Sequence, residues 1–256
     1  MATPKTTSIF RQLFDPVSST YTYLLGCPET RQAVLIDPVM PAWQRDLQIV
    51  NDLGCRLVMT IDTHIHADHI TSASTLRREA GSRIALPALD ALPCADLGLE
   101  DGVPVRIGAL QLDPMHTPGH TDNHFSILAG DRVLTGDALL IDGCGRTDFQ
   151  SGDARALYAS VRGRLFGLPG ETLVYPAHDY QGRTVSSIAQ EKQRNPRLGG
   201  NRTLEEFVQL MRNLDLPYPK FIDYAVPGNR ECGRCPDHLP ENLQQYCHAM
   251  ELSPQG

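Results

Sequence analysis

Long hydrophobic runs are absent from this sequence of 256 residues. No stretch approaches the roughly 20 apolar residues of a membrane-spanning helix, so no membrane segment is expected. The first residues, MATPKTTSIFRQLF, lack the apolar core of a secretory signal. They are rich in Ser and Thr and carry no acid before Asp15, which is faintly typical of a transit peptide. No low-complexity segment, repeat or long linker divides the chain.

An excess of positive charge is also absent. The chain has 23 Lys and Arg against 30 Asp and Glu, and its formal net charge is -7. Because nucleic acid is strongly anionic, an acidic chain is a poor general binder of it, and we expect no nucleic-acid partner. An anionic substrate would need a local basic patch that overcomes the negative field of the whole protein.

The sequence offers no Ser-His-Asp triad and no phosphate-binding loop. Its seven cysteines are an odd number and most stand singly, which indicates free thiols in a reducing compartment. We expect the bacterial cytoplasm, or the mitochondrial matrix if the source is eukaryotic. Only the carboxy-terminal tail clusters such residues: Cys232-x-x-Cys235 precedes His238, Cys247 and His248. This tail could bind zinc, form a disulfide or simply be polar, since its spacing fits no defined zinc module.

Strands and helices alternate irregularly along the chain, which predicts an α/β fold. Turn residues and apolar runs predict strands, with hairpins at 20–38 and 124–137. Apolar residues at helical spacing, with matching start and stop residues, predict helices. The last of these begins with a capping box, Thr203 and Glu206, and Asp153 is available as the cap of the helix before it. The strands are expected at 20–26, 32–38, 55–63, 103–116, 124–130, 132–137 and 171–180, and the helices at 41–54, 70–81, 153–170 and 203–217.

Metal-ligand residue types follow several of these strands. The stretch THIHADH, positions 63–69, holds His64, His66, Asp68 and His69, a run that no packing argument requires. His116, Asp137 and His178 also lie directly after apolar stretches. Since strand ends can share one edge of a sheet, we expect His64, His116, Asp137 and His178 to come together. Imidazole and carboxylate donors suit zinc, iron or manganese.

Other residues near these motifs are interpreted as structural. His120 and His124 are expected to support the fold or to orient the metal ligands from behind. Cys144 lies between Gly143 and Gly145, a pair that predicts a turn with unusual backbone angles. A cysteine in that position is more often a small buried side chain than a nucleophile.

The order His64-x-His66-x-Asp68-His69, His116, Asp137 and His178 resembles the metallo-β-lactamase superfamily. The resemblance covers residues 10–230 and leaves 231–256 as a Cys-containing tail. It implies an αββα sandwich, with two facing sheets, helices outside and a metal site at one edge. The usual chemistry of that superfamily is hydrolysis by two zinc ions, but the fold hosts many reactions.

A second signature narrows the resemblance. GCGRTDFQ at 143–150 and MRNLDLPYPKFIDYAVPGNRECG at 211–233 look like the persulfide dioxygenase family, relatives of glyoxalase II. That family implies one Fe(2+) per chain, held by His64, His116 and Asp137 as a facial triad that leaves positions open. It leaves His66, Asp68, His69 and His178 to orient ligands or move protons.

The implied reaction oxidises glutathione persulfide with dioxygen and water to sulfite and glutathione. Every residue for a second metal is still present, so a two-zinc thioester hydrolase of the glyoxalase II type stays open. A catalytically idle sulfur carrier that uses the Cys-rich tail is a third alternative, which the intact ligand set disfavours. Homologues of this kind are often homodimers.

Two residues are candidates for substrate binding. Arg146 could anchor a glutathione carboxylate or form a structural ion pair with Asp148, because a guanidinium binds carboxylates bidentately. Tyr180, two residues after His178, could bond the substrate or cap the strand. Asp142 departs from the basic residue that many relatives carry before GCGRTDF, which puts the charge near the site and the preferred thiol carrier in doubt.

Overall fold

The structure, a computed structural model, describes residues 8–248. These residues form two compact units. Of the described residues, the first unit takes in those up to Gly98, Arg106–Leu110 and those from Tyr218 onward. The second unit takes in Leu99–Val105 and Gln111–Pro217. Within the described part, no helix combines the length and apolar character needed to cross a membrane.

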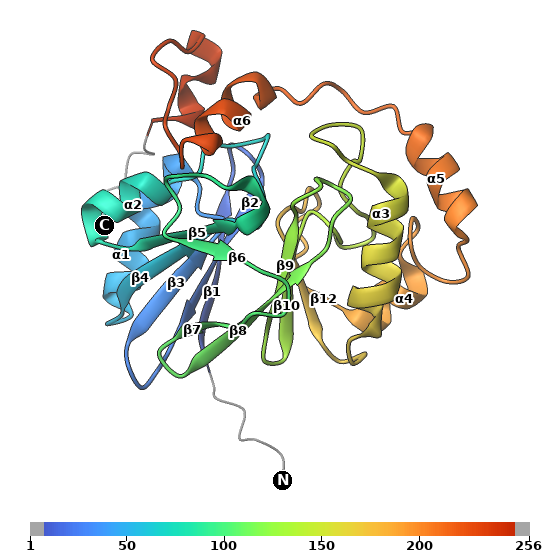
Figure 1. Cartoon of the computed structure of the whole chain (residues 1–256), viewed down its shortest axis with the longest axis horizontal. Helices are drawn as coiled ribbons and strands as arrows, with labels where there is room; N and C mark the ends of the chain where they lie inside the picture. The colour runs from blue at the N-terminus through green and yellow to red at the C-terminus, as the bar shows by residue number, and fades with distance from the viewer. Residues whose placement is uncertain (1–7, 249–256) are drawn as a thin grey trace. The chain divides into compact units, whose positions relative to one another are not determined.

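A six-stranded mixed sheet organises the first unit (Figure 1). Its first three strands are antiparallel, and β3, β4 and β5 are parallel. The buried run Ala33–Ile36 fits a strand covered on both faces. The predicted hairpin of β2 and β3 is confirmed. In sheet order the strands are β1 (Ile9–Asp15), β2 (Thr20–Gly26), β3 (Gln32–Ile36), β4 (Arg56–Ile61), β5 (Arg83–Pro87) and β6 (Leu97–Leu99).

Helices α1 (Trp43–Asp52) and α2 (Ala73–Ala80) follow β3 and β4. Val50 of α1 and Leu76 of α2 join one buried cluster with the strand residue Leu35, so both helices pack on this sheet. Gly81 ends α2 as predicted, with a left-handed φ of 71°. Short 3-10 turns lie at Met40–Ala42 and Ala88–Asp90.

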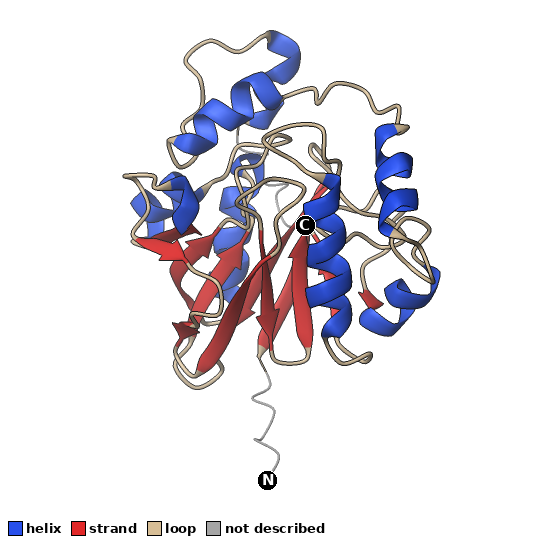
Figure 2. Cartoon of the chain, turned by 45° about the vertical axis from the view of Figure 1, so that its right-hand side comes forward, coloured by secondary structure: helices blue, strands red, loops and turns tan. Residues whose placement is uncertain are grey.

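The second sheet is also six-stranded and mixed (Figures 1 and 2). Strand β9 pairs antiparallel with both β8 and β10, and β11 runs parallel to β10. The carboxyl ends of β8, β10 and β11 therefore lie at the same edge. In sheet order the strands are β12 (Ser186–Ser187), β11 (Leu173–Pro176), β10 (Arg132–Gly136), β9 (Phe125–Ala129), β8 (Leu110–His116) and β7 (Val105–Ile107).

Three helices pack in the second unit: α3 (Ala154–Ala159), α4 (Ile188–Arg194) and α5 (Leu204–Arg212). The chain continues from α3 through a π turn, Ser160–Arg164, and a 3-10 turn, Leu165–Gly167. The predicted cap at Asp153 and the capping box of Thr203 with Glu206 are both confirmed. A buried cluster joins Leu157, Phe207 and Ile188 to Val133 and Val174 of the sheet.

Helix α6 (Ile222–Arg230) has no counterpart among the predicted elements. Pro227 lies inside it and disfavours a helix by local propensity. Tertiary packing explains why the helix forms: Phe221 and Ala225 share a buried cluster with Met40 and Ile70. The 3-10 turn Glu241–Tyr246 adds Leu243 and Tyr246 to this cluster.

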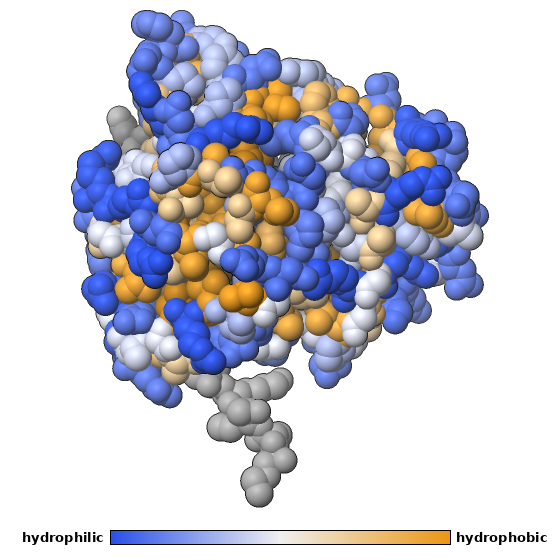
Figure 3. Space-filling view, in the orientation of Figure 1, coloured by the Kyte–Doolittle hydropathy of each residue, from blue (hydrophilic) through white to orange (hydrophobic). Residues whose placement is uncertain are grey.

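Hydrophobic side chains also reach the surface. Figure 3 shows them in orange, gathered over the part of this face where β5 lies in Figure 1. Leu89, in the turn after β5, is 65% exposed. Single exposed apolar residues are normal on protein surfaces and carry no function by themselves.

The cysteines correct the prediction of free thiols. Disulfides join Cys94 to Cys232 and Cys235 to Cys247. Only Cys27, Cys55 and Cys144 are free in the described part of the chain, and all three are buried. Local spacing is misleading here, because Cys232 and Cys235 each bond to a cysteine outside the C-x-x-C pair.

Thiol titration tests this pairing. Denatured without reductant, the protein should expose three reactive thiols, and after reduction all seven. Peptide mapping should recover the Cys94–Cys232 and Cys235–Cys247 links. Seven reactive thiols in the unreduced protein would contradict the pairing.

Asp46 is a fully buried carboxylate in the first turn of α1. Burial raises its pKa to about 6, although the guanidinium of Arg45, 2.8 Å from Oδ1, acts in the opposite direction. Nearby Asp15 adds to the rise. The folded state therefore holds this proton more tightly than the unfolded chain does. The resulting stabilisation is complete below the unfolded pKa, about 4, and is lost as the pH rises through 6.

Asp46→Asn should remove this pH dependence, because an amide does not titrate. Between pH 4 and 7 the free energy of unfolding of the unaltered protein should fall relative to that of the variant, as measured by urea denaturation. Asp52→Asn removes an exposed charge from the same helix and serves as the control. A constant difference between Asp46→Asn and the unaltered protein across this range would contradict the assignment.

Candidate metal centre

The loop between β4 and α2 carries the THIHADH stretch. His64, His66 and His69 are each at most 1% exposed, although their ring nitrogens are polar. Buried polar groups are stable only where they find partners. The partners of these histidines therefore define what each ring can do.

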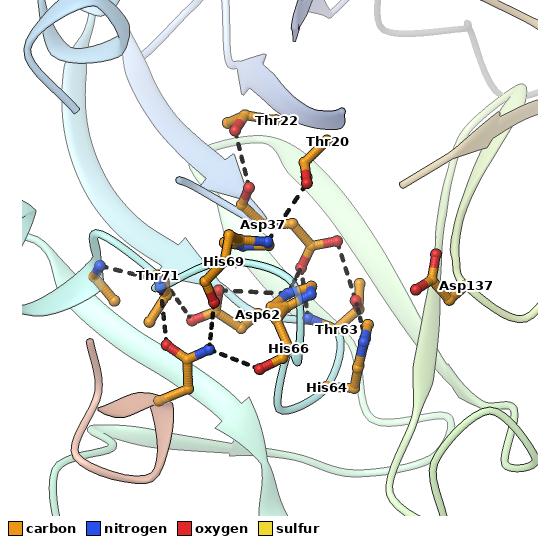
Figure 4. Close-up of polar contacts among 12 residues, drawn as sticks. Thr20, Thr22, Asp37, Asp62, Thr63, His64, His66, His69, Thr71 and Asp137 are labelled. Atoms are coloured by element: carbon orange, nitrogen blue, oxygen red, sulfur yellow. Dashed lines mark hydrogen bonds and ion pairs between the residues drawn. The ribbon is translucent and has the colours of Figure 1, made fainter. Parts of the chain in front are cut away.

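Asp37 anchors the start of this loop (Figure 4). It directly follows β3, is 1% exposed and has a φ of 51°, a left-handed conformation that Asp tolerates better than most residues. Its Oδ1 accepts from the backbone N–H of Thr63 at 2.7 Å, and its Oδ2 from the Thr63 hydroxyl at 3.0 Å. Its own backbone is held by Ile61 and Thr22.

This anchor sets the tautomer of His64. The Nδ1 atom of His64 lies 3.0 Å from the Thr63 hydroxyl oxygen. Because that hydroxyl gives its hydrogen to Asp37, its oxygen accepts from Nδ1–H. The Nε2 atom of His64 then carries the ring's lone pair, which is the form a metal requires.

His66 is bound differently. Its Nε2 lies 3.1 Å from Oδ1 of Asp37 and 3.8 Å from Oδ1 of Asp62. Burial by itself would lower the pKa of His66, but the charge of Asp37 outweighs it and raises that pKa to about 9. In return His66 holds the pKa of Asp37 below its usual value against the effect of burial, while burial raises the pKa of Asp62 to about 7. At neutral pH, His66 is thus a buried cation that uses Nε2 on Asp37.

Asp68 and His69 form a third group. Oδ2 of Asp68 accepts from the Thr20 hydroxyl at 3.0 Å and lies 2.8 Å from Nδ1 of His69. Donor atoms of His66, Asp68 and His69 lie within 4.8 Å of one another. Ligand types for a second metal are therefore close together on this loop.

In the second unit, Asp137 follows β10 and lies beside two imidazoles. Its Oδ2 is 3.4 Å from Nε2 of His120 and 3.6 Å from Nε2 of His178. The Nδ1 atom of His120 lies 2.8 Å from the carbonyl oxygen of Arg146, which can only accept, so Nδ1 carries the hydrogen. In its neutral form His120 therefore directs its Nε2 lone pair toward a carboxylate, a donor arrangement that fits a cation.

His116, which was expected as a metal ligand, directs its Nε2 to a backbone carbonyl. It ends β8 at the expected edge of the sheet, but its Nε2 lies 3.0 Å from the carbonyl oxygen of Asp122. Its backbone is bonded to Asp101 and Arg164. His120, which the sequence analysis treated as structural, lies beside Asp137 instead.

The loop after β8 brings His120 to that place. Gly119 has a φ of 138°, and a Cβ there would overlap the backbone of Leu157. The carbonyl of Gly119 accepts from Asp153, and that of Pro118 from Ser160. The loop is therefore packed tightly against α3.

Two structural interpretations are confirmed. Nε2 of His124 accepts from the backbone N–H of Asp137 at 3.0 Å, and its Nδ1 lies 2.9 Å from the Thr117 hydroxyl, so it supports the fold around Asp137. Cys144 is 2% exposed, and burial raises the pKa of its thiol to about 11. Such a thiol is not a nucleophile at neutral pH.

Arg146 forms the ion pair that the sequence offered as one alternative. Its Nε and Nη2 each lie 2.7 Å from an oxygen of Asp148, and its Nη1 donates to the carbonyl of Pro217. Tyr180 is 74% exposed and stacks on the ring of His178, with centroids 6.0 Å apart.

Asp142 has a basic partner. Arg183 bonds both Asp142 and Asp179, the residue after His178, so the acidic group before GCGRTDF is neutralised locally. The guanidinium thereby links the loop after β10 to the loop after β11.

Sequence reasoning missed Asp37, Asp62 and Thr63. A usable signal existed for the two acids, because each directly follows an apolar strand, as the metal-ligand residues do. Thr63 has no such signal, since its role depends on Asp37, 26 positions away.

The family model of the metallo-beta-lactamase superfamily matches residues 15–178. The chain belongs to this superfamily, and the expected metallo-β-lactamase fold, an α/β fold with two mixed sheets and helices, is confirmed.

More specific relatives are persulfide dioxygenases. The chain is 50% identical to "Persulfide dioxygenase ETHE1, mitochondrial" of Homo sapiens over 88% of this chain and 89% of the relative. The crystal structure of ETHE1 from Myxococcus xanthus matches with a TM-score of 0.86 and 55% identity, over 88% of this chain and 99% of that one. A hydroxyacylglutathione hydrolase of Cereibacter sphaeroides is 33% identical over 71% of each chain. Within the superfamily, the chain thus belongs to the persulfide dioxygenase family.

Asp37→Asn should strongly destabilise the metal-free protein. The amide oxygen can still accept from the Thr63 N–H and from His66, but the amide NH2 cannot accept from the Thr63 hydroxyl, and the buried imidazolium loses its counter-charge. Removing one partner of a buried ion pair typically costs about 3–5 kcal/mol of unfolding free energy.

Asp62→Asn is the matched control, since that carboxyl also faces His66 but has its pKa raised by burial to about 7. Its Oδ could still accept from Thr71. Urea denaturation should show a much smaller loss for Asp62→Asn, and equal losses for the two variants would contradict the role of Asp37 as anchor.

Proposed function

We propose that this chain is an iron-dependent persulfide dioxygenase. It oxidises glutathione persulfide with dioxygen and water to sulfite and glutathione. Sequence identity of 50% to a relative named as a persulfide dioxygenase, and of 55% to a solved ETHE1 structure, supports this activity over its alternatives. One geometric observation supports a metal beside Asp137: Nδ1 of His120 is bonded to the carbonyl of Arg146, which leaves its Nε2, 3.4 Å from Oδ2 of Asp137, as a donor.

The proposed ligands are His64, His120 and Asp137. His120 takes the place that the sequence analysis gave to His116. Neighbouring groups hold a hydrogen on Nδ1 of both His64 and His120, so each ring presents Nε2. Two imidazoles and a carboxylate are the donor set of mononuclear iron(II) oxygenases.

Bound iron(II) would supply open positions at which a sulfur anion and dioxygen can lie side by side, and it would pass electrons from the sulfur to the dioxygen. The chain's own contribution is orientation. Asp37 and Thr63 hold His64, the carbonyl of Arg146 holds His120, and His124 holds the backbone of Asp137. His178, within 3.6 Å of Asp137, is placed to accept or return a proton at Nε2.

The candidates for contacts with the substrate are more exposed residues. Tyr180 presents a 74% exposed ring beside His178, and we propose that it contacts the thiol carrier. Arg146 is committed to Asp148 and Pro217, which supports a bracing role near His120 over direct anchoring of a substrate carboxylate. We also propose that the chain forms a homodimer. The proposed compartment is the cytoplasm or the mitochondrial matrix, and the human relative is named as mitochondrial.

A two-zinc thioester hydrolase remains the second candidate. The clustering of His66, Asp68 and His69, and the 33% identity to a hydroxyacylglutathione hydrolase, favour it. The two functions differ in metal, in stoichiometry and in the need for dioxygen.

Metal analysis with oxygen uptake separates them. Protein loaded anaerobically should bind about one iron(II) per chain and consume dioxygen when glutathione persulfide is added. Two zinc ions per chain, with hydrolysis of a glutathione thioester and no dioxygen uptake, would overturn the proposal.

His116→Ala, at the end of β8, and His120→Ala, in the loop that follows it, form a matched pair. His120→Ala should lose iron and lower dioxygen uptake by more than the roughly 10–100-fold typical of residues behind the ligands. His116→Ala should keep about one iron and stay within about tenfold of full activity. The reverse result would restore His116 as the ligand.

A further inference from the structure

Asn229 lies near the end of α6, far from the metal loop in sequence, yet it bonds directly to that loop. Its Nδ2 donates to the carbonyl of His66 at 2.9 Å and to the carbonyl of His69 at 2.8 Å. Its Oδ1 accepts from the backbone N–H of Thr71 at 2.9 Å. The residue is 2% exposed, so water does not compete with these bonds.

These bonds use the amide almost completely. Both Nδ2 hydrogens and one Oδ1 lone pair are committed, which no other side chain of that size can reproduce. The contacted groups are backbone atoms of the metal loop, so the amide fixes the path of the chain through His66, His69 and Thr71. Thr71 in turn donates its hydroxyl to Asp62.

The segment around Asn229 is built to lie close to the loop. A Cβ on Gly228 would come within 2.7 Å of the Ile70 side chain, and one on Gly233, at a φ of 93°, would overlap the carbonyl oxygen of Thr71. The carbonyl of Cys232 accepts from both the backbone and the hydroxyl of Ser74 in α2.

A covalent link holds the same segment: Cys232 is bonded to Cys94 in the segment between β5 and β6.

We propose that Asn229 is a positioning residue of the iron site, which rests on the proposed function. Asp37 holds the first part of the loop through Thr63, and Asn229 holds its second part through three backbone groups. Ligand positions must be kept within roughly 0.5 Å for tight binding and catalysis. Asn229 thereby limits the movement of the segment that continues from His64, and it slows release of the metal.

Three variants test this role. Asn229→Asp replaces the donor by an oxygen that faces two carbonyls, and Asn229→Ala removes all three bonds. Asn242→Asp makes the same chemical change at an exposed position of the carboxy-terminal segment. Val50→Ala, in the buried cluster under α1, lowers stability without touching the loop and separates positioning from general destabilisation.

Two readouts apply to these proteins. In the metal-free state, hydrogen exchange of the peptide spanning 63–75 should be faster in both Asn229 variants than in the unaltered protein. In the iron(II)-loaded state, release of iron to a chromogenic chelator should be ~10–100-fold faster. Asn242→Asp should change neither readout, and Val50→Ala should leave the exchange of this peptide and the iron release near the unaltered values.

The outcomes distinguish this role from the proposed function. Unchanged exchange and unchanged iron release in the Asn229 variants, or equal changes in Val50→Ala, would overturn the positioning role. Faster exchange in a protein that binds no iron would overturn the proposed function and, with it, positioning of an iron site. If the variants do not fold, hydrogen exchange is measured on the unaltered metal-free protein. The backbone amide of Thr71 should then exchange as slowly as the amides of β4. Exchange of this amide within seconds would contradict the positioning role.

Discussion

The buried carboxylate of Asp37 is the interaction on which the rest of the site depends. It joins the end of β3 to the loop after β4 and compensates the charge of His66. Its second oxygen acts through Thr63 on the ring of His64. One acidic side chain therefore determines which nitrogen of His64 carries the hydrogen, and its charge favours the protonated form of His66.

That division of roles connects the fold to the proposed chemistry. A hydrolase of this superfamily needs several neutral histidines to grip two zinc ions, whereas an oxygenase needs a metal that is only half surrounded by protein. Asp37 holds Nε2 of His66, so Nδ1 is the nitrogen of that ring left as a donor. The loop therefore keeps the full superfamily motif, and the proposal of a single metal rests on the likeness to persulfide dioxygenases.

Strand ends were the most informative feature of the sequence. They located Asp137 and His178 correctly at one edge of the second sheet, and the helix caps at Asp153 and Thr203 were equally clear. The strand-end rule pointed to His116 at the end of β8, whereas His120, in the loop after that strand, lies beside Asp137. Tight packing of Gly119 on Leu157 decides that His120 reaches Asp137, and this packing leaves no local pattern.

Long-range contacts account for the other differences. Asn229, helix α6 and the Cys94–Cys232 pair owe their roles to partners roughly 140–160 positions away in the chain. Local sequence signals predict something different: Pro227 disfavours the helix, and the C-x-x-C spacing suggests a disulfide between Cys232 and Cys235. Tertiary burial overrides both signals, since Ile70 and Phe221 form one buried cluster.

The most direct measurement is a crystal structure of the iron(II)-loaded protein with anomalous diffraction at the iron edge. We expect one iron per chain, bound by Nε2 of His64, Nε2 of His120 and the carboxylate of Asp137, with His66 still bonded to Asp37. A second metal on Asp68 and His69, or His66 or His116 bound to the iron, would contradict it.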